Sequence, residues 1–207
     1  MISSGTLRPD IVVLAAGASI RLGRNKALVR IHGESVLRIQ LAKLSPLTRG
    51  KVSVVVPRRS PVRREALRLG ADCIVNPDPS RGMSGSVRAA LQRLRYSKAV
   101  LILPVDLIAL NSADLVRMLQ VWRGHRRRLI ARRLGTRAVT PMILPRHLFP
   151  IGADLSGDAG LRELITGLQA SQRVLVTMPS ADIDVDTAAD LAAVRRRFNA
   201  GSLRCSR

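Results

Sequence analysis

Aromatic residues are scarce in this chain of 207 residues, and Phe, Trp and Tyr together make up 2% of it. Because proteins that bind single-stranded nucleic acids stack bases on aromatic rings, the scarcity argues against such a binding platform. The core must therefore consist mainly of Leu, Val, Ile and Ala. Hydrophobic residues make up 46% and charged residues 24% of the chain, proportions typical of a globular rather than a disordered protein.

Cysteine is rare as well, and the chain contains only Cys73 and Cys205. These two residues lie far apart and have no spacing typical of a metal site, which argues against a disulfide framework and against a cysteine-based zinc site. Cys73 lies in an apolar run, and we expect it to be a core residue. The low cysteine content fits a reducing compartment, and we predict a cytoplasmic protein.

Long apolar runs are absent. None approaches the ~20 residues needed to span a bilayer, so we expect no membrane contact. The run Ile11–Ala18, preceded by Arg8, has some features of a signal peptide, but it is short and Asp10 precedes it. A first buried strand explains this run better.

Acidic residues are few relative to basic ones. The chain has 14 Asp and Glu against 35 Lys and Arg, a formal net charge of +21. This balance favours anionic partners: nucleotides, phosphorylated metabolites, nucleic acids or a membrane surface. Arginine spread over surface helices can equally reflect genome composition, so charge alone leaves the partner open.

Segments that predict strands alternate with segments that predict helices. The predicted strands are Ile11–Ala16, Lys51–Pro57, Asp72–Val75, Ala99–Val105, Arg128–Leu134, Ala138–Leu144 and Arg173–Met178. The predicted helices are Ser35–Leu44, Pro61–Leu69, Ser84–Leu94, Ala113–Trp122, Asp158–Leu168 and Thr187–Phe198. This alternation predicts an α/β fold with a mostly parallel sheet covered on both faces. We expect a single domain over residues 1–207, with its core at about 10–199 and a frayed tail at 200–207.

The loop after the first predicted strand contains residues suited to binding phosphate. In sheets of this kind, ligands bind beyond the carboxyl ends of the strands. Gly17 and Gly23 allow a tight backbone close to an anion, Ser19 adds a hydroxyl group, and Arg21 and Lys26 add mobile positive charge. The spacing fits neither the Walker motif nor the dinucleotide motif Gly-x-Gly-x-x-Gly. The alternative is an ordinary basic surface turn.

Three aspartates are candidates for a metal site. Asp106 ends the most apolar predicted strand, where a bound Mg²⁺ would relieve the cost of an unpaired carboxylate. Its alternative role is to cap the next helix, which Asn111 or Ser112 can also cap. Asp184 and Asp186 lie two residues apart on a predicted extended segment and face the same way. One of them could complete the metal site. Alternatively, both carboxylates could stabilise the N-terminus of the last predicted helix through its dipole.

Five segments resemble, in the same order, the motifs of nucleotidyltransferases with a Rossmann-like three-layer α/β sandwich. Within that group the chain is most similar to the molybdenum-cofactor cytidylyltransferases, and the resemblance covers nearly the whole chain. It departs from the family at Val139-Thr140-Pro141, where Gly-His-Pro is usual, and at Gly85, where Ser is usual. These departures concern the acceptor more than the nucleotide. The segments are "LAAGASIRLGRNK", "NPDPSRGMSGSVRAAL", "VLILPVD", "LSGDAGLRELI" and "DIDVDTAADL".

The resemblance implies a magnesium-dependent transfer of CMP from CTP to a phosphorylated acceptor, with release of pyrophosphate. The acceptor it implies is molybdopterin carrying molybdenum, and the implied partner is a molybdenum hydroxylase or its maturation chaperone. The implied metal ligands are Asp106, Asp184 and Asp186, and the implied catalytic residues are Arg21, Lys26 and Asp106. The implied nucleotide-binding residues are Leu14, Ala15, Ala16, Gly17, Ser19, Arg21, Lys26, Gly82, Ser84 and Ser86.

The preference for cytosine as the base of the nucleotide is predicted from the methyl group of Ala16. The similar guanylyltransferases tend to have Gly-Gly where this chain has Ala16-Gly17, so a methyl at Ala16 would narrow the slot beside the base and favour a pyrimidine. Ser86 and the backbone near Gly82 would then hydrogen-bond cytosine. The alternatives are that Ala16 packs under the sheet and that Ser84 serves as a helix N-cap.

Other functions stay open at this stage. One is a guanylyltransferase of the same fold, or an enzyme that activates a sugar or another phosphorylated metabolite. Another is a degenerate member that binds nucleotide without catalysis. A third is a basic RNA-binding protein, supported by the arginine runs at 126–128 and 195–197. Because these runs lack interleaved aromatics, the sequence disfavours nucleic acid as the partner.

Overall fold

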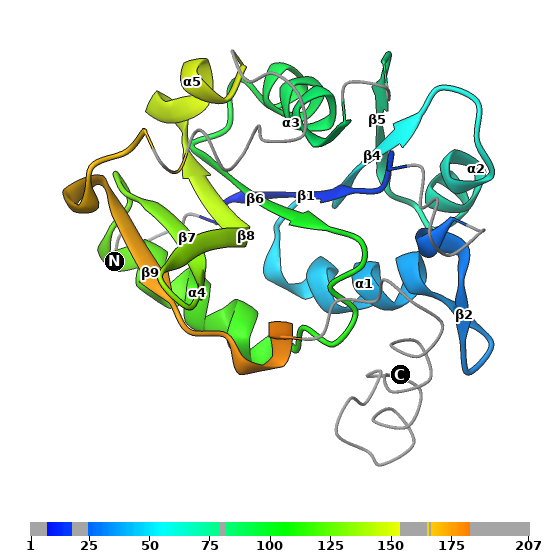
Figure 1. The fold of residues 1–207 in the computed structure, drawn as a ribbon. Coiled ribbons are helices and arrows are strands. Elements are labelled where there is room, and N and C mark those ends of the chain that lie inside the picture. The colour runs from blue at the N-terminus through cyan, green and yellow to red at the C-terminus, as the bar shows by residue number, and fades with distance from the viewer. Residues whose placement is uncertain (1–7, 18–24, 79–81, 154–164, 166, 183–207) are drawn as a thin grey trace, which may run out of the picture.

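The computed structural model describes residues 8–17, 25–78, 82–153, 165 and 167–182, and this part of the chain forms a sheet with helices on both faces (Figure 1). The sheet has seven strands in the order β5-β4-β1-β6-β8-β7-β9. A separate two-stranded hairpin joins β2 (Arg30–Ile31) to β3 (Glu34–Ser35). The strands of the large sheet are β1 (Asp10–Leu14), β4 (Ser53–Pro57), β5 (Asp72–Asn76), β6 (Ala99–Pro104), β7 (Leu129–Leu134), β8 (Arg137–Pro145) and β9 (Arg173–Val176).

Five α-helices are described, and short 3₁₀ turns join several of the elements. One such turn, at Lys26–Leu28, follows the loop after β1. No described helix is long and apolar enough to span a membrane. The helices are α1 (Val36–Leu44), α2 (Pro61–Arg68), α3 (Gly82–Arg93), α4 (Ser112–Gly124) and α5 (Phe149–Ala153).

Strand direction brings several strand ends to one edge of the sheet. β5, β4, β1 and β6 run parallel to one another, whereas β8 runs antiparallel to both β6 and β7. We call the edge where β1 and β6 end the carboxyl edge, and the opposite one the amino edge. Because β8 runs the other way, its first residues lie at the carboxyl edge too.

Apolar residues on alternate sides of each strand build two cores. In β1, Ile11 and Val13 pack with α1, α2 and α4 on one face of the sheet. Val12 and Leu14 pack with α3 and α5 on the other face. Figure 1 shows α3 and α5 on one side of the strands and α1 and α4 on the other. A strand buried on both faces needs an almost continuous apolar run, which is why these strands are legible in the sequence.

The predicted mostly parallel sheet is confirmed, and all seven predicted strands exist with ends within two residues of those expected. Four predicted helices are also confirmed within two residues. The predicted helix at 187–198, the tail at 200–207 and most of the predicted helix at 158–168 lie outside the described residues. Gly167 and Leu168, at the end of that last prediction, are not helical. The β2–β3 hairpin and α5 were not predicted.

Three local expectations were wrong. β1 ends at Leu14, so Ala16 belongs to the following loop rather than to the strand. Ser84 is not the N-cap of its helix, because α3 begins at Gly82, whose φ of 64° gives the turn into the helix. Cys73 is only half-buried, because it lies on β5 at the open end of the strand order.

Candidate functional site

Two backbone hydrogen bonds extend the sheet beyond the ends of β1 and β6. Ala15 donates its N–H to the carbonyl of Val55 at 2.9 Å, and Val105 donates to the carbonyl of Leu14 at 3.1 Å. The loops that follow β1 and β6 are therefore held side by side at the carboxyl edge. Ala15 and Ala16 are buried there, with 3% and 5% of their surface exposed.

An ion pair joins these two loops. The ammonium group of Lys26 lies 3.0 Å from Oδ2 of Asp106, although 80 positions separate the two residues in sequence. Both side chains keep some exposure, 13% for Lys26 and 27% for Asp106, so the pair borders solvent. The structure thus brings together two of the residues predicted to form the site.

Lys26 is held in place by a small capped turn. Asn25 accepts a hydrogen bond from the N–H of Ala27 at 3.0 Å through its side-chain Oδ1. Ala27 is fully buried and anchors the turn in the core below α1. A short polar cap and a small apolar residue therefore fix the backbone from which the Lys26 side chain reaches Asp106.

The alternative role of Asp106, as the cap of the next helix, is wrong. α4 begins at Ser112, and its cap is Asn111, whose Oδ1 accepts from the N–H of Asp114 at 2.8 Å. The carboxylate of Asp106 therefore serves the carboxyl edge rather than a helix.

A buried polar pair links β5 to α3 at the same edge. Asn76 donates from its side-chain amide to Oγ of Ser86 at 3.1 Å, and its Oδ1 accepts from the N–H of Asp78 at 3.0 Å. Both Asn76 and Ser86 are almost fully buried. Ser84, on the first turn of α3, is buried as well. The predicted base-binding segment is thus a helix start fixed by Asn76.

The backbone of Gly17 lies in open space at the carboxyl edge. Its φ lies outside the left-handed region, and a Cβ built on it would meet no atom within 4 Å. Gly33, by comparison, has a φ of 83°, which by itself favours glycine. At Gly17, as at Gly50 and Gly124, neither the backbone conformation nor the described packing demands glycine. Gly17 differs from these two in its place at the carboxyl edge, where the open space leaves its backbone accessible to a ligand.

Sequence reasoning missed Arg132. This arginine lies on β7 with 4% of its surface exposed, and it pairs in register with Val139 of β8. Because β7 ends at the carboxyl edge, Arg132 places a buried cation on the half of the sheet that also contains Thr140. The signal was present in the sequence, since an arginine inside an apolar strand is seldom buried without a partner or a task.

Several predicted residues are not placed by the structure. Ser19, Arg21 and Gly23 in the first loop, and Asp184 and Asp186 near the end, lie outside the described residues. Within the described part, no group of three or more His, Cys, Asp or Glu side chains could hold a metal ion. Asp106 is therefore the described member of the predicted metal site, and the contribution of the other two aspartates stays a prediction.

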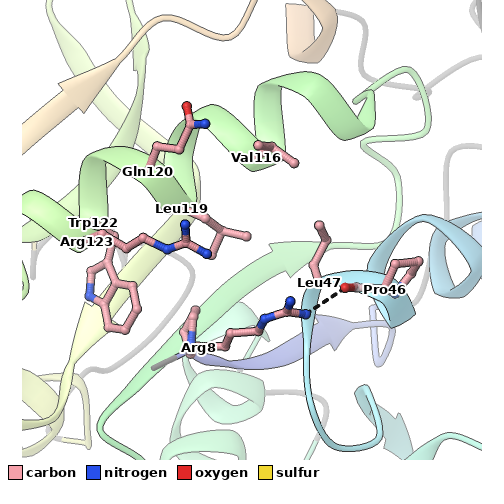
Figure 2. Close-up of a pocket in the computed structure, with 9 residues that line it drawn as sticks. Arg8, Pro46, Leu47, Val116, Leu119, Gln120, Trp122 and Arg123 are labelled. Carbon is pink, nitrogen blue, oxygen red and sulfur yellow. Dashed lines mark hydrogen bonds between the residues drawn. The ribbon is translucent and has the colours of Figure 1, made fainter. Parts of the chain in front are cut away.

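The amino edge contains a hollow of a different kind (Figure 2). It has a volume of about 140 Å³ and lies between the start of β1, the end of α1 and the last turns of α4. Arg8 donates to the carbonyl of Pro46 at 2.8 Å across one side of it, and Trp122 forms part of its wall. The described residues that line it include no carboxylate, so they lack the anionic ligand through which proteins usually hold Mg²⁺.

A mostly parallel sheet with a glycine loop, a lysine and an aspartate at its carboxyl edge defines the class of Rossmann-like nucleotidyltransferases. Within that class, the chain belongs to the family of the MobA-like NTP transferase domain, whose sequence model matches residues 11–174. The protein is thus a nucleotidyltransferase of this family, as the sequence motifs implied.

Two curated sequences are similar to the chain. One, phosphoenolpyruvate guanylyltransferase of Mycolicibacterium paratuberculosis, is 31% identical over 71% of this chain. The match spans 66% of that protein, just under two thirds of its length. The other, a probable molybdenum cofactor guanylyltransferase of Opitutus terrae, is 29% identical over 80% of this chain and 77% of its own.

Solved structures show the same fold. The crystal structure of Rv0371c from Mycobacterium tuberculosis H37Rv superposes with a TM-score of 0.74 and 26% identity, covering 91% of this chain and 98% of that one. A complex of Rv0371c with manganese superposes with a TM-score of 0.68 and 23% identity, covering 90% of this chain and 97% of that one.

Proposed function

We propose that the protein transfers CMP from CTP to a phosphorylated acceptor, molybdopterin carrying molybdenum, and releases pyrophosphate. The observation that carries the nucleotidyl transfer in this proposal, whichever base is used, is the juxtaposition of Lys26 and Asp106, 3.0 Å apart, at the same edge as the open backbone of Gly17. A cation and a carboxylate at the end of parallel strands are what a triphosphate and its metal need.

The first loop binds the triphosphate in this proposal. The open space at Gly17 lets a phosphate approach the backbone, and the ammonium of Lys26 binds it as a point charge. Arg21 and Ser19, which lie in the same loop, would add a guanidinium fork and a hydroxyl group. Their positive charge stabilises the pyrophosphate as it leaves.

The residues at the carboxyl edge fit a divalent cation. Mg²⁺ in nucleotide enzymes is held by one or two carboxylates together with substrate phosphates, so a site with Asp106 alone among the described residues is compatible with it. The ion pair with Lys26 uses only one oxygen of that carboxylate. Asp184 or Asp186 would supply a second carboxylate. When bound, the metal neutralises charge on the phosphates during transfer.

The chemical step needs no covalent enzyme intermediate. A phosphate oxygen of the acceptor forms a bond to the α-phosphorus of CTP, and the bond from that phosphorus to the β-phosphate oxygen breaks. Lys26 and Arg21 hold the departing pyrophosphate, while Asp106 would hold the metal ion that binds the reacting phosphates. On the acceptor side, buried Arg132 adds positive charge near Thr140.

Cytosine is the base we propose, because the methyl of Ala16 is buried directly after β1. This methyl occupies space that a glycine would leave to a larger base. Ser86, fixed by Asn76, offers a hydroxyl at the start of α3 for the edge of the base. The product would pass to a molybdenum hydroxylase or its maturation chaperone.

The second candidate is guanylyl transfer. It is favoured by the names of the two similar sequences, a phosphoenolpyruvate guanylyltransferase and a probable molybdenum cofactor guanylyltransferase. In this version GMP replaces CMP, and phosphoenolpyruvate becomes a second possible acceptor. The same Lys26–Asp106 pair would serve both reactions, so the pair does not discriminate between them.

Pyrophosphate release tests the two candidates directly. The protein is assayed with CTP, GTP, ATP and UTP, each with molybdenum-loaded molybdopterin, phosphoenolpyruvate or no acceptor. We expect CTP with molybdopterin to exceed GTP by at least about tenfold, roughly 1.4 kcal/mol. Equal or greater use of GTP would replace the cytidylyl proposal by the guanylyl one. No turnover with any pair would refute both.

A further inference from the structure

A long basic groove lies beside the open edge of the sheet. It has a volume of about 660 Å³ and runs between β5 and the solvent-facing side of α3, two elements that lie next to each other in Figure 1. Among its described lining residues are one carboxylate, Asp78, and four arginines. We call it the arginine groove and define it by Arg58, Arg88, Arg93 and Arg95.

Two neighbouring hollows lengthen this surface. One shares Arg58 with the groove and continues along the first turns of α2, where Arg59, Arg63 and Arg64 line it. The other shares Arg88 and Arg95 and continues toward α5. The positive surface is therefore longer than a single bound anion requires.

β5 offers its backbone to this groove. Asp72 donates its N–H to the carbonyl of Val52, on the side where β5 pairs with β4. Because alternate residues of a parallel strand face the same neighbour, the N–H and C=O groups of Cys73 and Val75 face the opposite edge. Within the described part of the chain no strand pairs with that edge. Such an edge can accept a further strand.

We propose that the arginine groove is a docking site for an acidic, extended segment of a partner protein, which adds to the sheet beside β5. Backbone hydrogen bonds to Cys73 and Val75 would give the segment its direction. Acidic side chains on one side of the segment would meet Arg58 and Arg95 by charge complementarity, whereas Arg93 already pairs with Asp72 of β5 at 3.4 Å. This proposal does not depend on which nucleotide the enzyme uses.

Other occupants fit less well. A second copy of this chain would bring another set of arginines against the first, and like charges repel. Single-stranded nucleic acid is held by stacking as well as by charge, and none of the described residues that line the arginine groove is aromatic. The exposed ring next to the groove, Tyr96, is already stacked by the guanidinium of Arg95, 4.5 Å from its centroid. An extended acidic peptide uses both the open backbone and the arginines.

The test uses a fluorescent ten-residue peptide of alternating Glu and Val, followed by fluorescence anisotropy at low salt. The groove variant reverses two exposed charges, Arg58→Glu and Arg95→Glu. The matched control reverses two exposed charges elsewhere, Arg126→Glu and Arg127→Glu, between α4 and β7. We expect the groove variant to bind at least about tenfold more weakly and the control to stay within about twofold of the wild type.

A second peptide tests strand addition separately from charge. Methylation of all its backbone amide nitrogens removes the hydrogen-bond donors of both alternate sets without changing its charge, and we expect about tenfold weaker binding. Equal binding of the methylated peptide, equal loss in groove and control variants, or no binding at millimolar concentration would overturn the proposal. So would tighter binding of a ten-nucleotide oligouridylate that the groove variant abolishes.

Pyrophosphate release keeps this proposal distinct from the proposed enzyme function. Arg58 and Arg95 are not among the residues assigned to the nucleotide, the metal or the acceptor, so the groove variant is expected to turn over soluble substrates like the wild type. Loss of peptide binding with unchanged turnover supports docking alone. Turnover that falls in the groove variant in proportion to peptide binding would assign these arginines to substrate binding and overturn the docking proposal.

Discussion

The two edges of the sheet each have an aspartate in a polar contact, and the contacts differ in kind. At the amino edge, Ser97 donates its hydroxyl to Asp10, and both residues lie at the start of neighbouring strands. At the carboxyl edge, Asp106 is bound by the charged end of Lys26, a long side chain from a separate turn. At the amino edge, a hydroxyl on a short side chain links the beginnings of two strands. At the carboxyl edge, the long side chain of Lys26 can leave the carboxylate of Asp106 and bind a phosphate group of a ligand instead.

The largest difference between the two edges is expected when each aspartate is replaced by asparagine. Asp106→Asn removes the charge that binds metal and Lys26, and we expect turnover to fall by about a thousandfold or more, roughly 4 kcal/mol, with the fold intact. Asp10→Asn is expected to leave turnover unchanged and to lower the free energy of unfolding by about 1 kcal/mol. Pyrophosphate release and urea denaturation measure the two quantities. Near-normal turnover by Asp106→Asn would show that Asp106 is no more important for catalysis than Asp10.

The next effect concerns the cations of the first loop. Lys26→Ala and Arg21→Ala are each expected to weaken nucleotide use by about ten- to hundredfold. Arg21→Ala should act more on kcat, because a planar guanidinium can follow charge as it moves onto the leaving group. Steady-state kinetics together with calorimetric titration of CTP separate the two effects. Unchanged affinity and turnover in both variants would remove this loop from the active site.

A smaller effect is expected for the base. Ala16→Gly removes the buried methyl after β1 and should reduce the preference for CTP over GTP by about tenfold or less while keeping activity. Competition between the two nucleotides at equal concentration measures the preference. If the ratio is the same in both proteins, Ala16 only packs under the sheet. The variant's urea midpoint serves as a control for loosening of the loop.

The smallest effect is expected for a carboxylate away from both edges. Glu65 of α2 is bound by Arg68, at 2.9 Å to Oε1, and by the hydroxyl of Ser35 at 2.8 Å, the N-cap of α1. The hydrogen bond from Arg68, more than that from Ser35, holds the pKa of Glu65 below its ordinary value of 4.5. We expect Glu65→Gln to cost about 1 kcal/mol of stability at pH 7.

The pH dependence of this cost has a definite sign. A carboxylate whose pKa is lowered on folding stabilises the protein above its unfolded pKa and loses that contribution as the pH falls through the folded pKa. The difference between wild type and Glu65→Gln should therefore begin to shrink at about pH 4.5 and vanish at lower pH. Thermal unfolding from pH 7 to pH 3 checks this. A difference that persists at pH 3 would show that Glu65 acts through packing.

The sequence predicted the parallel half of the fold well, because doubly buried strands such as β6 need continuous apolar runs. It also predicted that Lys26 and Asp106 belong to one site, since strand ends meet at one edge. It did not predict their direct ion pair, which depends on where a side chain from a capped turn can reach. Arg132 was missed although it follows an apolar run in β7, because the sequence does not show which of the two neighbouring arginines, Arg132 or Arg133, is buried.

The tight turn between β7 and β8 has a consequence for how this enzyme can diversify. Leu134 pairs with Arg137, so only Gly135 and Thr136 connect the two strands, and Gly135 has a φ of 59°. This hairpin lies at the carboxyl edge, in the half of the sheet formed by β8, β7 and β9, and is separated by β6 from β5, β4 and β1. Evolution or an engineer can lengthen it at low cost to a surface loop. Acceptor choice can then change while the nucleotide half of the molecule is inherited unaltered.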